Sequence, residues 1–307
     1  MRCGMSNCSS FSRGNIHAVV AGGGFATLLA VLLLLNGCAT LASSVAASVS
    51  SKMAQNLSRA FSNYDDLATV ETAIPAYLLM VESFLGQDPN NEALLLTASR
   101  LYNSYTSAFV KDPERAPRLS QKGLGYALRA VCNRHPEACG LIDQPFDRFQ
   151  AVIARMTRDD LPALYALGAA WATDVQARQA DWNAIAQLPR IESIMNRVLT
   201  LDEAFETGGA HLYMGVFSTL IPPGLGGHPE EGRKHFERAL EISGKKNLMV
   251  HVLYARHYAR MVFDRELHDR LLNEALASDP RIDGYVLINM AARAEARTLL
   301  AAADAYF

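Results

Sequence analysis

The chain has 307 residues, of which 50% are hydrophobic and 20% charged, so it can bury the core of one large or two small domains and is unlike a disordered protein. Its formal net charge is −2 at pH 7, and no run is rich in lysine or arginine. This composition excludes the basic footprint of nucleic-acid-binding proteins, and we expect no nucleic-acid partner.

The N-terminal segment predicts export. Two arginines precede an apolar run at residues 18–35, which is followed at once by small and polar residues, as in a secretory signal peptide. The run ends in LNGC, residues 35–38, which resembles the lipobox of bacterial lipoproteins, where the peptide is cut before the cysteine. The alternative, an unprocessed membrane anchor, stays open.

We therefore predict a signal peptide at residues 1–37 and a lipid anchor at Cys38. Several acyl chains, palmitate among them, would hold the mature protein stably on a membrane. Ala39 follows the cysteine in place of aspartate, which by resemblance to the bacterial sorting rule favours the periplasmic leaflet of the outer membrane. Residues 38–65, rich in serine and alanine, are predicted to be a tether.

Residues 66–307 are predicted to be one helical domain, which begins where Asp66 can cap a helix. Apolar residues recur there at helical spacing, and no run alternates as strand residues do. The stripes are Leu94, Ala98, Leu101, Tyr105 and Phe109; Leu164, Leu167, Trp171 and Val175; Ile191, Met195, Val198 and Leu201; Leu248, Val252, Ala255, Ala259 and Val262; and Leu267, Leu271 and Ala275. The pattern predicts an all-α fold.

Four helices are expected to end with similar polar, proline or glycine signals, near Pro89, Asp202, Gly244 and Pro280. The last intervals are close to the helix–turn–helix period of tetratricopeptide repeats. We predict helical hairpin repeats in a degenerate tetratricopeptide-like solenoid. An irregular helical bundle is the alternative.

Cys132 and Cys139 flank a short segment that contains Pro136. An exported protein can form a disulfide there, and the sequence leaves a bridge and free thiols equally open. A metal site that adds His135 lacks a fourth ligand at usable spacing. We expect neither a metal nor a cofactor.

The segment IPPGLGGHP, residues 221–229, interrupts the helical pattern. Its prolines cannot continue a helix, its glycines permit positive φ, and Pro229 suits the first turn of the next helix, so a tight turn into a helix is predicted. The turn is either a plain connector or part of a ligand or partner surface. The candidate residues for that surface are Tyr165, Trp171, Tyr213, Phe217, Pro222, Pro223, Gly224, Leu225, Gly226 and Gly227. Core packing is the alternative for the aromatic residues.

We identify no catalytic residues and expect no enzyme. Each acidic pair is followed by an apolar helical stripe, as helix caps are. The pairs are Asp159-Asp160, Asp202-Glu203 and Glu230-Glu231. The histidines at 211, 228, 235 and 268 have no cysteine or carboxylate at ligand spacing.

Two segments resemble a known family. Residues 224–243, GLGGHPEEGRKHFERALEIS, and residues 248–280 are similar to the signature of the TRAP transporter T-component family, the TatT lipoproteins. The matching residues are Gly226, Gly227, Pro229, Glu230, His235, Phe236, Glu237, Tyr254, Ala255, Tyr258, Ala259, Asp264, Leu271 and Leu272. His228 stands where the family has aspartate, which weakens the N-cap. Residues 74–110, 160–175 and 287–307 extend the resemblance over nearly all of the mature chain.

The resemblance implies a lipid-anchored periplasmic protein that forms a homotrimer and docks the solute-binding P component of a TRAP transporter. A concave surface and an internal channel would pass an apolar ligand to or from that partner. Two alternatives remain. One is a scaffold lipoprotein for outer-membrane or secretion assembly, and the other is an envelope hydrolase with paired carboxylates.

Overall fold

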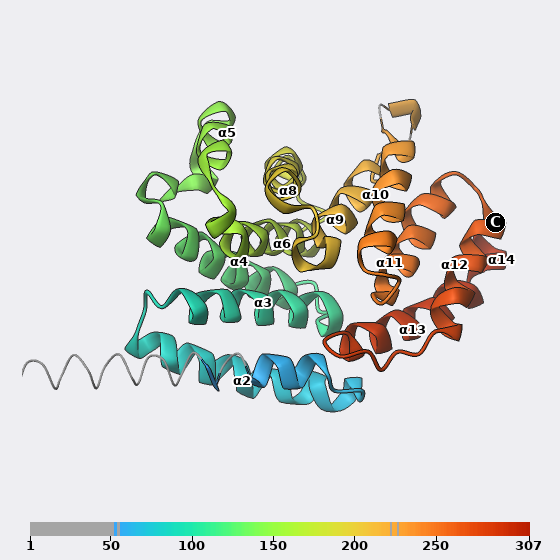
Figure 1. Cartoon of the computed structure of the whole chain (residues 1–307), viewed down its shortest axis with the longest axis horizontal. Coiled ribbons are helices and arrows are strands. Elements are labelled where there is room, and N and C mark those ends of the chain that lie inside the picture. The colour runs from blue at the N-terminus through green and yellow to red at the C-terminus, as the bar shows by residue number, and fades with distance from the viewer. Residues whose placement is uncertain (1–51, 54–55, 222, 226) are drawn as a thin grey trace, which may run out of the picture. The chain divides into compact units, whose positions relative to one another are not determined.

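The computed structural model describes residues 52–53, 56–221, 223–225 and 227–307 (Figure 1). The predicted signal peptide, the anchor at Cys38, Pro222 and Gly226 lie outside the described residues. The described part of the chain is helical and contains no strand. The all-α prediction is confirmed.

The first half of the described chain forms a layered stack of helices. Its helices are α2 (Leu67–Gln87), α3 (Glu92–Phe109), α4 (Arg115–Arg134), α5 (Phe146–Arg155) and α6 (Leu161–Ala177), with 3₁₀ turns η1 (Pro136–Ala138), η2 (Leu141–Asp143) and η3 (Arg158–Asp160). Asp66 caps α2, because its carboxylate accepts hydrogen bonds from the backbone N–H groups of Ala68 and Thr69. The predicted cap is therefore present.

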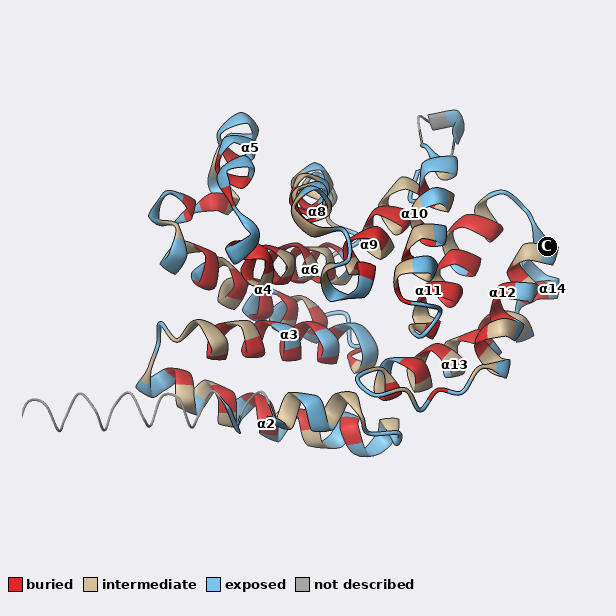
Figure 2. Cartoon of the chain, in the orientation of Figure 1, coloured by how far each residue is buried: buried red, intermediate tan, exposed pale blue. Residues whose placement is uncertain are grey.

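The predicted stripes form the core of this half. α3 packs against α2, α4 and α6, and α6 is buried along most of its length (Figure 2). Leu94 of α3 and Leu164 and Trp171 of α6 have no exposed surface. Burial of apolar side chains at roughly 25 cal/mol per Å² stabilises such an arrangement more than helix propensity does.

The second half continues with shorter helices. They are α7 (Trp182–Ile185), α8 (Leu188–Asp202), α9 (Gly209–Ser218), α10 (Pro229–Ile242), α11 (Leu248–Leu253), α12 (Arg265–Ala277), α13 (Val286–Ala301) and α14 (Ala303–Tyr306), with 3₁₀ turns η4 (Phe205–Gly208) and η5 (Pro223–Leu225). The ends of α2, α8, α10 and α12 lie at or within three residues of the predicted stop signals. The boundaries were therefore readable from proline, glycine and polar residues.

One predicted stripe differs from the structure. The helix that begins with α11 widens into a π-helical segment, η6 (Tyr254–Ala259), instead of continuing as a regular α-helix. The wider turn shifts every later side chain around the helix axis, and Val262, expected on the apolar stripe, is 38% exposed. The stripe prediction is wrong at this position.

The start of the described chain contacts the loop before α13. Residues 56–62, inside the predicted tether, are helical, and the ring of Phe61 lies 5.2 Å from that of Tyr77 on α2. Beside them, Asn63 accepts a 2.6 Å hydrogen bond from the N–H of Gly284 and donates one to Asp283 (Figure 1). The loop before α13 is thus bound to the start of the helical stack.

One described helix, α2, is long and apolar enough to cross a membrane by length and composition. Its Val70, Ile74 and Val81 are nearly fully buried in a core cluster that also contains residues of α3. One face of α2 therefore packs against the core, while Leu79 on the helix is 69% exposed.

Candidate functional site

The interrupted segment connects two helices that touch closely. A Cβ atom added to Gly232 of α10 would lie 2.6 Å from Cγ2 of Thr219 and 3.0 Å from the carbonyl oxygen of Gly215 on α9. A Cβ on Gly215 would lie 2.9 Å from the ring of Phe236. Glycine at both positions therefore lets the α9–α10 hairpin close backbone to backbone.

The turn itself presents apolar residues to solvent. Leu220 and Ile221 are 43% and 48% exposed, and Pro223 and Gly224 after them are exposed as well. Pro229 opens α10 as predicted, with acidic residues in the first turn. His228 is the N-cap residue and makes no side-chain capping hydrogen bond, as expected for a residue in place of aspartate.

Residues of η6 hold the start of α10 in place. The hydroxyl of Tyr258 donates a 2.6 Å hydrogen bond to Glu230, one residue into the helix. One turn further, Tyr254 stacks on the buried ring of Phe236 with centroids 5.1 Å apart. The π-helical segment therefore aligns two tyrosines along α10 and fixes the helix that the turn leads into.

Three of the four predicted aromatic residues form one cluster. The ring of Tyr165 on α6 lies 6.1 Å from that of Tyr213 and 5.7 Å from that of Phe205, and Tyr213 lies 6.2 Å from Phe217. All four rings are partly buried against the central core. Trp171 is placed elsewhere, with no exposed surface and its ring 6.0 Å from that of Phe149, so it is a core residue.

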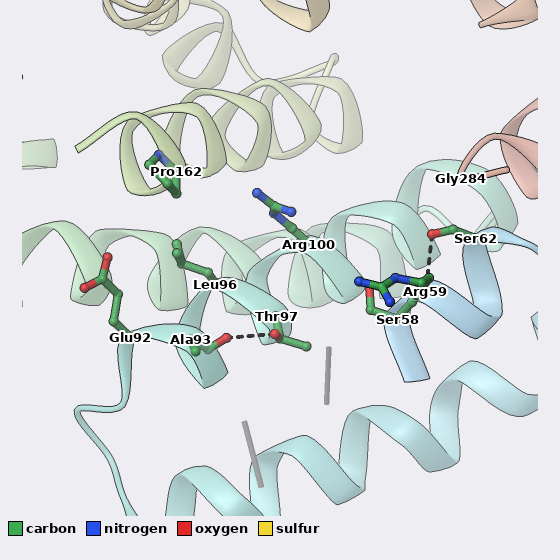
Figure 3. Close-up of a pocket in the computed structure, with 10 residues that line it drawn as sticks. All are labelled: Ser58, Arg59, Ser62, Glu92, Ala93, Leu96, Thr97, Arg100, Pro162 and Gly284. Carbon is green, nitrogen blue, oxygen red and sulfur yellow. Dashed lines mark hydrogen bonds between the residues drawn. The ribbon is translucent and has the colours of Figure 1, made fainter. Parts of the chain in front are cut away.

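An open cleft of about 680 Å³ lies between the residue 58–62 segment, α3 and the start of α6. It is lined by Ser58, Arg59, Ser62, Glu92, Ala93, Leu96, Thr97, Arg100, Pro162 and Gly284. Leu96 and Arg100 lie on the side of α3 that faces Pro162 of α6, and the residue 58–62 segment lies at the other end (Figure 3). The start of the described chain and the loop before α13 thus contribute to one cleft. Its lining is mixed, with charged residues beside apolar ones.

A strained turn borders the cleft. Glu206 and Thr207 have φ of 47° and 54°, values in the left-handed region that cost non-glycine residues roughly 1–2 kcal/mol each. Two contacts hold the strained backbone: Arg100 donates a 2.7 Å hydrogen bond to Glu206, and Tyr285 donates a 2.6 Å one to Thr207. The turn therefore joins α3 to the loop before α13 across the wall of the cleft.

The ion pair of Arg100 and Glu206 lies close enough to Tyr165 to influence its pKa. Burial, followed by the proximity of Tyr213 and Glu206, raises the pKa of Tyr165 well above its ordinary value. The hydroxyl is therefore neutral at physiological pH, and it lies within the influence of the ion pair at the cleft wall.

Comparison with known proteins identifies the family. The model of the TRAP transporter T-component family matches residues 63–307. The chain belongs to the TRAP transporter T-component family. A protein of Treponema pallidum (strain Nichols), described as uncharacterized, is 25% identical in an alignment of 245 residues that covers 73% of this chain and 75% of that protein. The matched region begins at Asn63, which contacts the loop before α13.

In this T-component protein, Asp160 and Glu203 of the predicted acidic pairs form hydrogen bonds and ion pairs with neighbouring side chains. Burial raises the pKa of Asp160, but hydrogen bonds from the Thr157 N–H and from His135 and Arg134 outweigh it and hold that pKa well below its usual range. Glu203 pairs with Arg238 and His211, which lower its pKa to about 2. These carboxylates are ionised structural partners.

The cysteine segment is joined in the structure. Cys132 and Cys139 form a disulfide with Cα atoms 4.6 Å apart, and His135 between them lies 2.9 Å from Asp160 at the start of α6. The bridge therefore holds a loop that helps to satisfy a buried carboxylate. Among the residues that the structure describes, no group of three or more His, Cys, Asp or Glu side chains is arranged to hold a metal ion.

One cluster was missed by sequence reasoning. His211 and His235, 24 residues apart, face each other across α9 and α10 with their Nδ1 atoms 2.9 Å apart. The two residues stand at equal sequence distance on either side of Pro223. Since antiparallel helices joined at a turn place such positions opposite each other, hairpin symmetry was the signal that could have found the contact.

Proposed function

We propose that this protein is the lipid-anchored periplasmic T-component of a TRAP transporter, where it docks the solute-binding component and helps an apolar ligand to pass. The observation that carries the proposal is the family match across residues 63–307, which gives the protein a transport-associated role. The finer assignment draws on the exposed turn, the cleft and the aromatic cluster.

The turn between α9 and α10 is the proposed docking surface. Leu220 and Ile221 expose apolar surface on a hairpin whose base is closed by glycine contacts, so the surface is presented by a preorganised element. Preorganisation lowers the entropic cost of association, and exposed apolar groups provide area to bury in an interface. Both features favour a protein partner over a plain connector.

The cleft and the aromatic cluster are the proposed path of the ligand. Leu96, Ala93 and Pro162 offer apolar surface next to the Tyr165 cluster, and Arg100 and Glu92 lie among them. Binding sites of this kind combine apolar walls with a few polar groups that fix orientation. An organic solute with a large apolar part fits this lining.

The anchor and the assembly belong to the same proposal. Acylation of Cys38 would hold the domain on the periplasmic face of a membrane, in our proposal the outer membrane, where a soluble solute-binding protein reaches it. A homotrimer would present three copies of the turn to its partners. Crosslinking of the acylated protein in its membrane tests the trimer directly.

The central experiment is purification of the full-length acylated protein from native membranes in mild detergent, with mass spectrometry of every protein and small molecule that accompanies it. We expect a periplasmic solute-binding protein in stoichiometric amount. At least tenfold less of that solute-binding protein should co-purify with an Ile221→Asp variant. A Leu79→Asp variant, which changes a residue 69% exposed on α2, is the matched control and should retain it.

Two outcomes would contradict the proposal. Recovery of outer-membrane assembly proteins without a solute-binding protein or a solute would identify a scaffold. Equal loss of the partner in both variants would show that docking does not use the turn. The first outcome overturns the proposed role in a TRAP transporter. The second overturns only the turn as the docking surface, so the two failures are distinguishable.

A further inference from the structure

The His211–His235 contact lies at the hairpin that carries the exposed turn. His211 is 8% exposed, and its ring centroid lies 5.1 Å from that of His235. The other ring nitrogen of His211, Nε2, lies 3.2 Å from Oε2 of Glu203. Glu203 is in turn fixed by Arg238, so three elements, α8, α9 and α10, converge on one imidazole.

The hydrogen-bond partners determine where the protons are. A carboxylate only accepts, so Nε2 of His211 carries the hydrogen, and Nδ1 of a neutral His211 is then an acceptor. His235 must donate from its own Nδ1 across the 2.9 Å contact. When both histidines are neutral, they are therefore in opposite tautomers.

The contact tolerates one added proton and not two. A first proton on the outer nitrogen of His235 leaves its Nδ1 hydrogen and the contact unchanged. A second proton places a hydrogen on Nδ1 of His211 as well, so that two donors and two positive charges face each other. The rings must then separate.

We propose that the His211–His235 pair is an acid-sensitive latch that holds α9 against α10 at neutral pH and releases the hairpin when both rings are protonated. The close glycine contacts lie one turn nearer the exposed turn, at Gly215 and Gly232. Separation of the rings therefore splays the helices about that contact and moves the exposed Leu220 and Ile221, which follow α9.

The charged surroundings set the direction of the pH dependence. Burial lowers the pKa of His211 in spite of Glu203, and Arg238 lowers it further. Burial and the neighbouring ring of His211 lower the pKa of His235, and Glu231 on the same helix opposes them. The latch is thus closed above the ordinary histidine pKa of about 6.5 and opens as the pH falls through these lowered values.

Hydrogen–deuterium exchange of the detergent-solubilised full-length protein, measured from pH 7 downward to the onset of acid unfolding and corrected for intrinsic exchange, tests the latch. We expect protection of α9 and α10 amides to fall about tenfold or more in the wild type, which corresponds to one pKa unit of coupling. His235→Asn keeps a donor, and its amide can turn to accept if His211 is protonated, so two positive charges never face each other and its protection should stay constant. His228→Asn, an exposed histidine at the same hairpin, should behave like the wild type.

Nitrogen NMR of the wild-type imidazoles decides the question without a variant. At pH 7 the spectrum should show His211 protonated at Nε2 and unprotonated at Nδ1, with a scalar coupling across the contact that disappears on acidification. A hydrogen on Nδ1 of His211 at pH 7 would overturn the proposal. So would pH-independent protection in the wild type, or an equal loss of protection in His235→Asn.

Discussion

Replacement of Gly232 by alanine tests the close approach of α9 and α10. The added methyl group would lie 2.6 Å from Cγ2 of Thr219 and 3.0 Å from the carbonyl oxygen of Gly215. The side chain of Thr219 can move only a little, because its hydroxyl donates to that same carbonyl at 2.8 Å, and the carbonyl moves only with its helix. The contact is therefore a true overlap.

The expected magnitude follows from two opposing effects. Overpacking of a tight contact costs about 1–3 kcal/mol, and alanine gains about 1 kcal/mol over glycine in helix propensity. Gly125→Ala in α4 is the matched control, because a Cβ there has no other atom within 4 Å and the propensity gain is unopposed. We expect Gly232→Ala to destabilise by about 1 kcal/mol and Gly125→Ala to stabilise by about 1 kcal/mol.

Urea unfolding followed by circular dichroism at 222 nm measures both variants against the wild type. The difference between the two variants, about 2 kcal/mol, isolates the helix contact, since the propensity term is common to both. A stabilised Gly232→Ala protein would show that the two helices are not in backbone contact. If the unfolding free energy changed its dependence on urea concentration while the urea midpoint stayed the same, the substitution would be acting on the unfolded state instead.

Three further perturbations have defined outcomes. Asp160→Asn should cost about 2 kcal/mol at pH 7, since it leaves His135 and Arg134 without their shared anion. Because the pKa of Asp160 is lowered on folding, its contribution is present above about pH 4 and is lost as the pH falls through the native pKa, so acid titrations of the two proteins should converge. Reduction of the Cys132–Cys139 bridge should cost roughly 2.5 kcal/mol by loop entropy, read as a lower melting temperature that a double serine variant reproduces without reductant. Lys245→Gly should stabilise by about 1 kcal/mol, since Lys245 has φ of 59°, and an unchanged urea midpoint would refute this.

Local signals in the sequence predicted much of the fold. The stripes of α3, α6 and α8 are spaced so that Leu94, Leu164 and Ile191 face one side of a helix, and all three are fully buried. Proline marks the ends of α2 and α12, and Gly244 marks the end of α10, through backbone chemistry that acts within a few residues. The turn into α10 followed from the same rules.

The site was predicted only in part. Tyr165, Tyr213 and Phe217 were expected near one another and form a cluster, whereas Trp171, of the same chemistry, lies in the core. Apolar spacing alone cannot distinguish a residue of the partly buried cluster from a residue of the core, because it predicts that a side chain is buried but not which helix covers it. Residues of the cleft, such as Arg59 and Arg100, carried no motif at all.

The sequence by itself determined that the chain is helical, where its helices stop, and which signals of export and family it carries. Only the tertiary structure decided the pairing of His211 with His235, the strained turn at Glu206, and the union of residues 58–62 with Gly284 in one cleft. The physical reason is distance along the chain. Helix propensity and capping act over a few residues, but these contacts join segments whose approach depends on how every intervening helix packs.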